Sequence, residues 1–100
     1  MIQAGSVSDQ LVLNLDFAPT VMDFLNIKNN EPWQGISLLP LMKGEKVQNW
    51  RDGIYYHYYE YPHGWHSVKR HYGIRTDRYK LIHFYNDIDK WELYDLENDP

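Results

Sequence analysis

The chain has 100 residues, which is enough for one small domain with a thin hydrophobic core. Its net charge of −4 excludes a general nucleic-acid-binding protein, which needs a net basic face, and we expect no nucleic acid partner. The absence of cysteine excludes a disulfide framework and a thiolate metal site. No apolar run approaches the roughly 18 residues of a membrane helix, so no membrane span is predicted.

The first half of the chain has a helical pattern. Residues 1–10 are small and polar, and we expect a flexible lead there. From Asn14 apolar residues recur at the spacing of one helical face, with Asn14 or Asp16 as the N-cap. The residues of this face are Leu15, Ala18, Met22 and Leu25. A surface loop is predicted at 28–32.

A second, short helix is predicted at 38–42. Ser37 can cap its first turn, and Gly44 can end it. After residue 52 the period changes to two, which is typical of strands. The predicted strands run from Ile54 to near Pro62 and over residues 71–76, 79–85 and 91–96. Helices followed by an antiparallel sheet of about four strands indicate an α+β fold.

Five histidines raise the question of a metal site: His57, His63, His66, His71 and His83. The pair His63 and His66 lacks the i, i+4 spacing and the intervening glutamate of a zinc protease. His57 and His83 occupy ordinary strand positions. The serines lie in capping or loop contexts, and none follows a Gly-x-Ser-x-Gly pattern. We therefore predict no metal ligand and no catalytic residue in this chain.

The stretch from 55 to 76 is dense in rings and cations. Four of its cationic or cationisable residues fall within seven positions, near Trp65 and Tyr72: Lys69, Arg70, His71 and Arg75. Arginine and lysine suit sulfate, carboxylate or phosphate groups, and flat rings suit the faces of sugars. A solvated strand edge that carries charges against aggregation is the alternative. The residues alone leave both interpretations open.

Four segments, in this order, resemble the C-terminal part of the type I sulfatase family, and in particular the bacterial glycan sulfatases. They are "NLDFAPTVMDFLNI", "QGISLLPLMKG", "YGIRTDRYKLI" and "WELYDLENDP". The resemblance runs from about residue 6 to residue 100. The residues that match the family pattern are Asp16, Pro19, Thr20, Gln34, Gly35, Ser37, Leu38, Arg75, Thr76, Tyr79, Lys80, Leu93, Tyr94, Asp95, Leu96, Asp99 and Pro100.

The resemblance implies an alkaline-phosphatase-like parent of several hundred residues. In that family an N-terminal α/β domain holds a calcium ion and a formylglycine made from a C/S-x-P-x-R motif. This chain contains no such motif, so we expect no cofactor in it and no activity from it alone. The expected fold is the C-terminal subdomain, a small antiparallel sheet with a helix packed on one face. The implied division is a lead at 1–10, a helical segment at 11–52 that follows the missing catalytic domain, and the sheet at 53–100.

In the family this subdomain helps to shape the substrate pocket. We expect the substrate-binding residues to be His66, Lys69, Arg70 and His71, with a sulfated carbohydrate as substrate and the catalytic domain as partner. The isolated piece is expected to self-associate. These residues indicate no compartment, but a periplasmic or extracellular location is expected for the parent.

Two alternatives stay open: a free-standing carbohydrate- or anion-binding module that uses Trp65, Tyr72 and the basic cluster, and an adaptor that packs on another protein.

Overall fold

The computed structural model describes residues 2, 4–28, 30–63 and 65–99. The chain divides into two compact units, Met1–Trp50 with the helices and Arg51–Pro100 with the sheet. The predicted α+β class and the four-stranded antiparallel sheet are confirmed. The three-part division at residues 10 and 52 stays a prediction. Asn29 of the expected loop and Pro100 of the closing motif lie outside the described residues.

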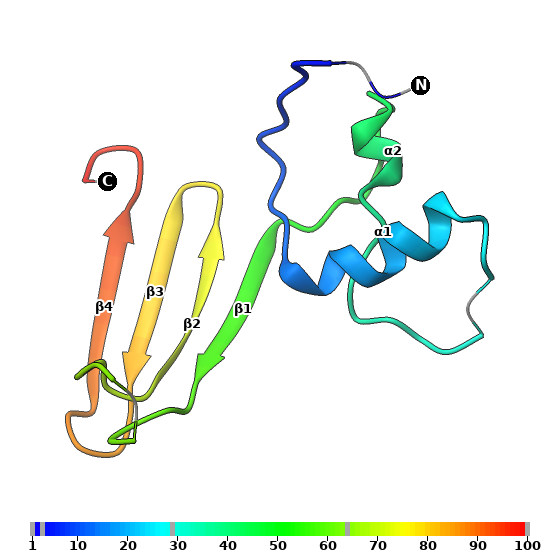
Figure 1. Ribbon diagram of the computed structural model, residues 1–100. Helices are drawn as coiled ribbons and strands as arrows, with labels where there is room; N and C mark the ends of the chain where they lie inside the picture. Colours follow the sequence, from blue (N-terminus) through cyan, green and yellow to red (C-terminus); the bar gives the residue numbers. More distant parts are fainter. Residues whose placement is uncertain (1, 3, 29, 64, 100) are drawn as a thin grey trace. The chain divides into compact units, whose positions relative to one another are not determined.

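The first unit contains both predicted helices (Figure 1). A 3-10 turn, η1 (Asn14–Asp16), leads into α1 (Phe17–Phe24), and α2 (Leu39–Met42) follows. Asn26 ends the first helix in the left-handed region at φ 54°, and Gly44 follows the second at φ 76°, as helix C-termini commonly require. No helix of the described residues is long and apolar enough to cross a membrane.

Asp16 is the fully buried carboxylate of the first unit. Its Oδ2 accepts a hydrogen bond from the Leu13 backbone N–H at 2.7 Å, and its Oδ1 accepts one from the Ile36 N–H at 2.8 Å. A buried carboxylate is tolerated only where such donors replace water. Asp16 therefore caps the helix entry by bonding back to Leu13, and it also ties the helix to a segment 20 residues away.

Thr20 and Asp23 extend this junction along the same face of α1, because i, i+4 and i+7 positions align on a helix. Thr20 Oγ1 accepts from the Leu38 N–H at 2.8 Å. The Ser37 hydroxyl donates to Asp23 Oδ2 at 2.6 Å. The first two segments of the sulfatase-like pattern are thus the two halves of one polar junction.

The apolar helix face expected from the sequence is not the buried one. Leu15 is 48% exposed and Leu25 is 57% exposed, whereas Pro19 is buried. The face that contacts residues 36–38 carries the polar groups of Asp16 and Thr20. The apolar face therefore lies open in the part of the chain that the structure describes.

The second unit is one antiparallel sheet in the order β1-β2-β3-β4 (Figure 1). Its strands are β1 (Gly53–Tyr58), β2 (His71–Thr76), β3 (Tyr79–Phe84) and β4 (Lys90–Asp95). These bounds agree with the predicted strands to within one residue, except that β1 ends at Tyr58 and not near Pro62 as predicted. Neighbouring strands are joined by the 59–70 segment, a tight turn at Asp77 and Arg78, and the 85–89 turn.

Tyr56 and Gly73 face each other across β1 and β2. A Cβ at Gly73 would lie 2.6 Å from Tyr56 Oη and 2.4 Å from the Leu81 carbonyl oxygen, so the ring can lie here only because the glycine has no side chain. Tyr56 Oη is buried without a hydrogen-bond partner among the described residues, and burial raises the pKa of Tyr56.

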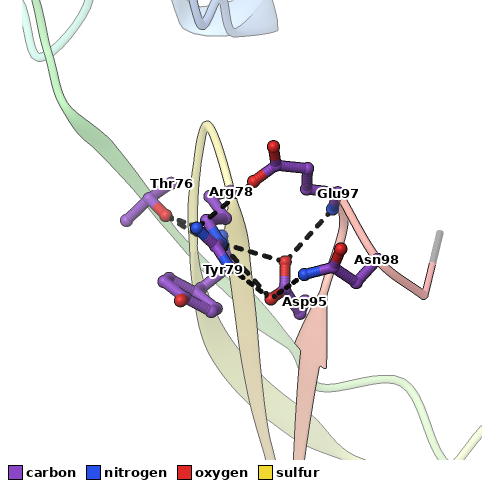
Figure 2. Close-up of polar contacts among 6 residues, drawn as sticks. All are labelled: Thr76, Arg78, Tyr79, Asp95, Glu97 and Asn98. Atoms are coloured by element: carbon purple, nitrogen blue, oxygen red, sulfur yellow. Dashed lines mark hydrogen bonds and ion pairs between the residues drawn. The ribbon is translucent and has the colours of Figure 1, made fainter.

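Arg78 fastens the β2–β3 turn to the end of β4 (Figure 2). Its Nη2 and Nε donate to the two carboxylate oxygens of Asp95 at 2.8 and 3.1 Å, and its Nη1 lies 3.2 Å from Glu97 Oε2. The Arg78 guanidinium, with a further donor from Asn98, holds the pKa of Asp95 well below its usual range. This fork explains why the third and fourth sulfatase-like segments occur together.

We predict that Gly35→Ala destabilises the first unit by about 3 kcal/mol, because an added Cβ would lie 2.0 Å from the Leu15 carbonyl oxygen. Gly53→Ala is the matched control: its nearest neighbour would be Ile74 Cδ1 at 3.5 Å, an ordinary contact. Urea unfolding followed by circular dichroism measures both. Equal stability of the two variants would contradict the close approach of Gly35 to the backbone of η1.

A second prediction concerns acid stability. Because the folded pKa of Asp95 is depressed, its contribution is present above the unfolded value of about 4 and is lost as the pH falls below it. The melting temperature of the wild type should therefore exceed that of Asp95→Asn at pH 7, and the difference should shrink below about pH 4. Salt should reduce it, because the pair is exposed.

Glu97→Gln is the control, since Glu97 is 68% exposed and its ion pair with Arg78 is the longer one. A larger effect from Glu97→Gln than from Asp95→Asn, or a difference that grows on acidification, would show that the fork does not stabilise the fold.

Candidate functional site

The four candidate residues gather at one end of the sheet. His66, Lys69 and Arg70 lie in the segment before β2, and His71 is the first residue of β2. His71 pairs with Tyr58 of β1 and with Phe84 of β3, so the turn between β3 and β4 lies at the same end. The structure therefore brings the candidates to one edge, but it gives each a different environment.

His71 presents one open ring nitrogen. Its ring lies against Tyr58, with 5.4 Å between ring centroids, and also contacts Tyr56 and Phe84. Its Nδ1 lies 2.8 Å from the Lys69 carbonyl oxygen, which can only accept, so Nδ1 is the donor. In the neutral ring Nε2 is then an acceptor. It makes no hydrogen bond within the described part of the chain, and it can accept one from a hydroxyl.

His66 has both ring nitrogens occupied. The Val68 backbone N–H donates to its Nδ1 at 3.3 Å, so the ring hydrogen of the neutral form belongs to Nε2. Nε2 in turn lies 2.9 Å from Tyr58 Oη, to which it donates. His66 therefore supports Tyr58, the ring on which His71 packs, and offers no open ring nitrogen to a ligand.

Lys69 is engaged by two side chains. Its ammonium lies 2.7 Å from Asp87 Oδ2 in the β3–β4 turn and also donates to the Tyr61 hydroxyl. The hydrogen bond to Asp87 raises the pKa of Lys69, and the same bond lowers the pKa of Asp87. The Lys69 side chain is still 33% exposed, so its ammonium is paired with Asp87 and also remains in contact with water.

Arg70 comes directly before His71 in the chain, and its side chain reaches the segment that follows β1. Its Nε donates to the Tyr59 carbonyl oxygen at 2.9 Å, and its own carbonyl accepts from the Tyr85 N–H at 3.3 Å. Its two Nη atoms make no hydrogen bond with the described residues. They form a fork that suits a carboxylate or sulfate.

Tyr72, one ring of the proposed free-standing binding module, does not share a face of the sheet with His71. Tyr72 lies on the opposite face of β2, and its hydroxyl is 2.8 Å from His83 Nδ1. Trp65 is fully exposed. Tyr72 and His71 therefore lie on different faces of β2.

His57 and His83 are more than ordinary strand positions. His83 Nε2 lies 2.8 Å from Asp89 Oδ1, and its ring stacks on Trp91 at 4.1 Å. His57 Nε2 lies 2.8 Å from Tyr85 Oη. The alternating pattern indicates a two-faced strand, but no sequence signal points to these partners, since Asp89 belongs to a polar turn.

The described residues do not fit the calcium ion that the sulfatase resemblance implies for the parent. Within residues 2, 4–28, 30–63 and 65–99, no three histidine, aspartate or glutamate side chains converge on one point. The buried carboxylate of Asp16 is occupied by backbone donors of Leu13 and Ile36. No step of a reaction is therefore assigned to a metal held by this chain.

The sequence and the fold both match sulfatases. An N-acetylglucosamine-6-O-sulfatase from Bacteroides thetaiotaomicron is 55% identical over 99% of this chain, and an arylsulfatase from Clostridium perfringens is 33% identical over 96%. A protein solved in complex with its substrate D-glucosamine-2-N,6-O-disulfate superposes with a TM-score of 0.91 at 54% identity, over 99% of this chain and 20% of that one. The chain spans 18% of each of the two sulfatases.

These relatives are longer proteins of alkaline-phosphatase-like fold, and the match lies in their C-terminal part. The model of the N-sulphoglucosamine sulphohydrolase C-terminal family matches residues 1–100. The sulfatase resemblance inferred from the four segments is therefore confirmed, and the chain belongs to the N-sulphoglucosamine sulphohydrolase C-terminal family.

Proposed function

We propose that this chain forms part of the substrate pocket of a sulfatase that hydrolyses sulfate esters of carbohydrates. The observation that carries the proposal is the 55% identity to an N-acetylglucosamine-6-O-sulfatase over 99% of the chain. The proposed substrate class is a glucosamine unit with a 6-O-sulfate, which agrees with the disulfated glucosamine bound to the structural relative.

The chain would contribute recognition rather than bond cleavage. Arg70 offers its Nη fork to an anionic group, such as a second sulfate or a carboxylate. His71 offers Nε2 as an acceptor for a ring hydroxyl, because Nδ1 is held by the Lys69 carbonyl. Because Arg70 Nε is held by the Tyr59 carbonyl and His71 Nδ1 by the Lys69 carbonyl, the two side chains would offer different groups to the sugar.

The chemistry would come from outside these residues. A catalytic domain with calcium and a formylglycine is proposed as the partner of this chain, and a periplasmic or extracellular location is proposed for the whole protein. The exposed apolar residues of α1, among them Phe17 at 62% and Phe24 at 66%, would meet that domain or, in isolation, a second copy.

A reading frame upstream of codon 1 that encodes a C/S-x-P-x-R motif would support the proposal, and a stop-flanked gene without it would favour a separate binding module.

In the full-length enzyme, Arg70→Ala and His71→Ala should each raise KM for N-acetylglucosamine 6-sulfate. Loss of one charge-assisted hydrogen bond costs about 1.5–3 kcal/mol, or roughly 10- to 150-fold in kcat/KM, and a hydroxyl bond to neutral histidine costs somewhat less. Because such contacts hold substrate and transition state about equally, kcat should change little. Turnover of 4-nitrophenyl sulfate, which carries no sugar, should be nearly unchanged.

Arg75→Ala is the matched control, because it removes a cation near the opposite end of β2. It should leave KM for both substrates close to the wild-type value. Equal losses on the sugar sulfate and on 4-nitrophenyl sulfate after Arg70→Ala or His71→Ala would show a role in the fold or the chemistry, and the proposed recognition would be wrong.

The 100-residue chain alone should not hydrolyse 4-nitrophenyl sulfate, even with added calcium. It contains no cysteine, and none of its serines is followed by the proline and arginine of the formylglycine motif, so it supplies no sulfatase nucleophile. The assay is turnover of the purified chain against a buffer blank. Activity that stays with the chain through a second purification would contradict the assignment of the chemistry to another domain.

A further inference from the structure

We propose that Lys69 is a positioning residue that holds His71 in place through Asp87 and Tyr61, and that its ammonium does not bind the sulfated ligand. The inference rests on the proposed function and assigns a role within the same site. A lysine beside an arginine and a histidine would by its charge be taken for an anion contact. In the structure, the Lys69 ammonium instead contacts Asp87 and Tyr61.

The ammonium of Lys69 connects two other segments. It lies 2.7 Å from Asp87 Oδ2, 18 residues further along the chain in the β3–β4 turn. It also donates to the hydroxyl of Tyr61 and lies 4.0 Å from the centroid of the same ring. Lys69 therefore fixes the 59–70 segment against the turn at the same end of the sheet.

The backbone of Lys69 acts directly on His71. The Lys69 carbonyl oxygen accepts from His71 Nδ1 at 2.8 Å, which sets the tautomer of the neutral ring and leaves Nε2 as its acceptor. A shift of the Lys69 backbone would therefore rotate the His71 ring or release Nδ1. The side-chain anchor and the carbonyl belong to one residue, so the anchor controls the orientation of His71 without touching a ligand.

The hydrogen bond from Lys69 is the main cause of the lowered pKa of the Asp87 carboxyl group. The positive charge of Arg70 makes a smaller contribution to the same shift. With its negative charge engaged by Lys69, Asp87 leaves the Arg70 fork free for an external anion. Loss of the lysine would free the carboxylate to compete for Arg70. The Lys69–Asp87 pair thus supports both proposed contacts. It holds His71 in position, and it engages the carboxylate that would otherwise attract Arg70.

The test is a double-mutant cycle in the full-length enzyme with Lys69→Met, Asp87→Asn and the double variant. N-Acetylglucosamine 6-sulfate and 4-nitrophenyl sulfate are the substrates. Each single variant should raise KM for the sugar sulfate by about 3- to 10-fold with kcat unchanged, since a misplaced binding group loses ground-state and transition-state contacts together. The double variant should be no worse than the larger single one, because both substitutions break the same contact.

Lys69→Arg should restore most of the affinity, since a guanidinium can also reach Asp87. The inference is overturned if Asp87→Asn leaves KM unchanged while Lys69→Met raises it, or if the two effects multiply, because the ammonium would then contact the ligand itself. Equal losses on 4-nitrophenyl sulfate would also overturn it, because they would indicate a general role in the fold.

Arg70→Ala and His71→Ala, measured alongside, separate this inference from the proposed function. If they raise KM for the sugar sulfate but the Lys69 and Asp87 variants do not, the positioning role is wrong and the proposed function stands. If none of the four affects the sugar sulfate selectively, the proposed function fails and the positioning role fails with it.

Discussion

The antiparallel register of β1 and β2 is the constraint on which the rest of the sheet depends. Tyr56 lies over Gly73, where any side chain would clash with the ring and with the Leu81 carbonyl. A slip of one residue would put Tyr72 or Ile74 opposite Tyr56 in place of Gly73 and would exchange the two faces of the strand. The packing of His71 on Tyr58, its partner in β1, follows from this register.

Polar contacts, more than a large apolar core, hold each unit together. The buried hydrophobic residues among those described are few: Leu11, Leu39 and Ile82. The helical unit is joined by the buried Asp16 carboxylate, and the turn of the sheet is fastened by the Arg78–Asp95 fork. Many apolar side chains of α1 stay exposed, as would be expected of a segment that packs on the remainder of a longer protein.

Local signals were enough to predict most of the elements. The period of two, with a turn at Asp77 and Arg78, located the β2–β3 hairpin, and Ser37 and Gly44 bounded the short helix. Contacts between distant residues could not be predicted this way. Asp16 was expected as a helix cap, and its bond to Ile36 depends on the packing of two segments. In the same way the charge of Lys69 suggested a ligand, but its partner Asp87 comes close only when β3 and β4 have folded.

The most direct test of the account is a crystal structure of the full-length protein with N-acetylglucosamine 6-sulfate bound to a catalytically inactive variant. The account predicts that this chain borders the sugar, with Arg70 Nη or His71 Nε2 within hydrogen-bond distance of it and the Lys69 ammonium still on Asp87. A bound sugar that contacts no residue of this chain, in a pocket formed wholly by the rest of the protein, would contradict it.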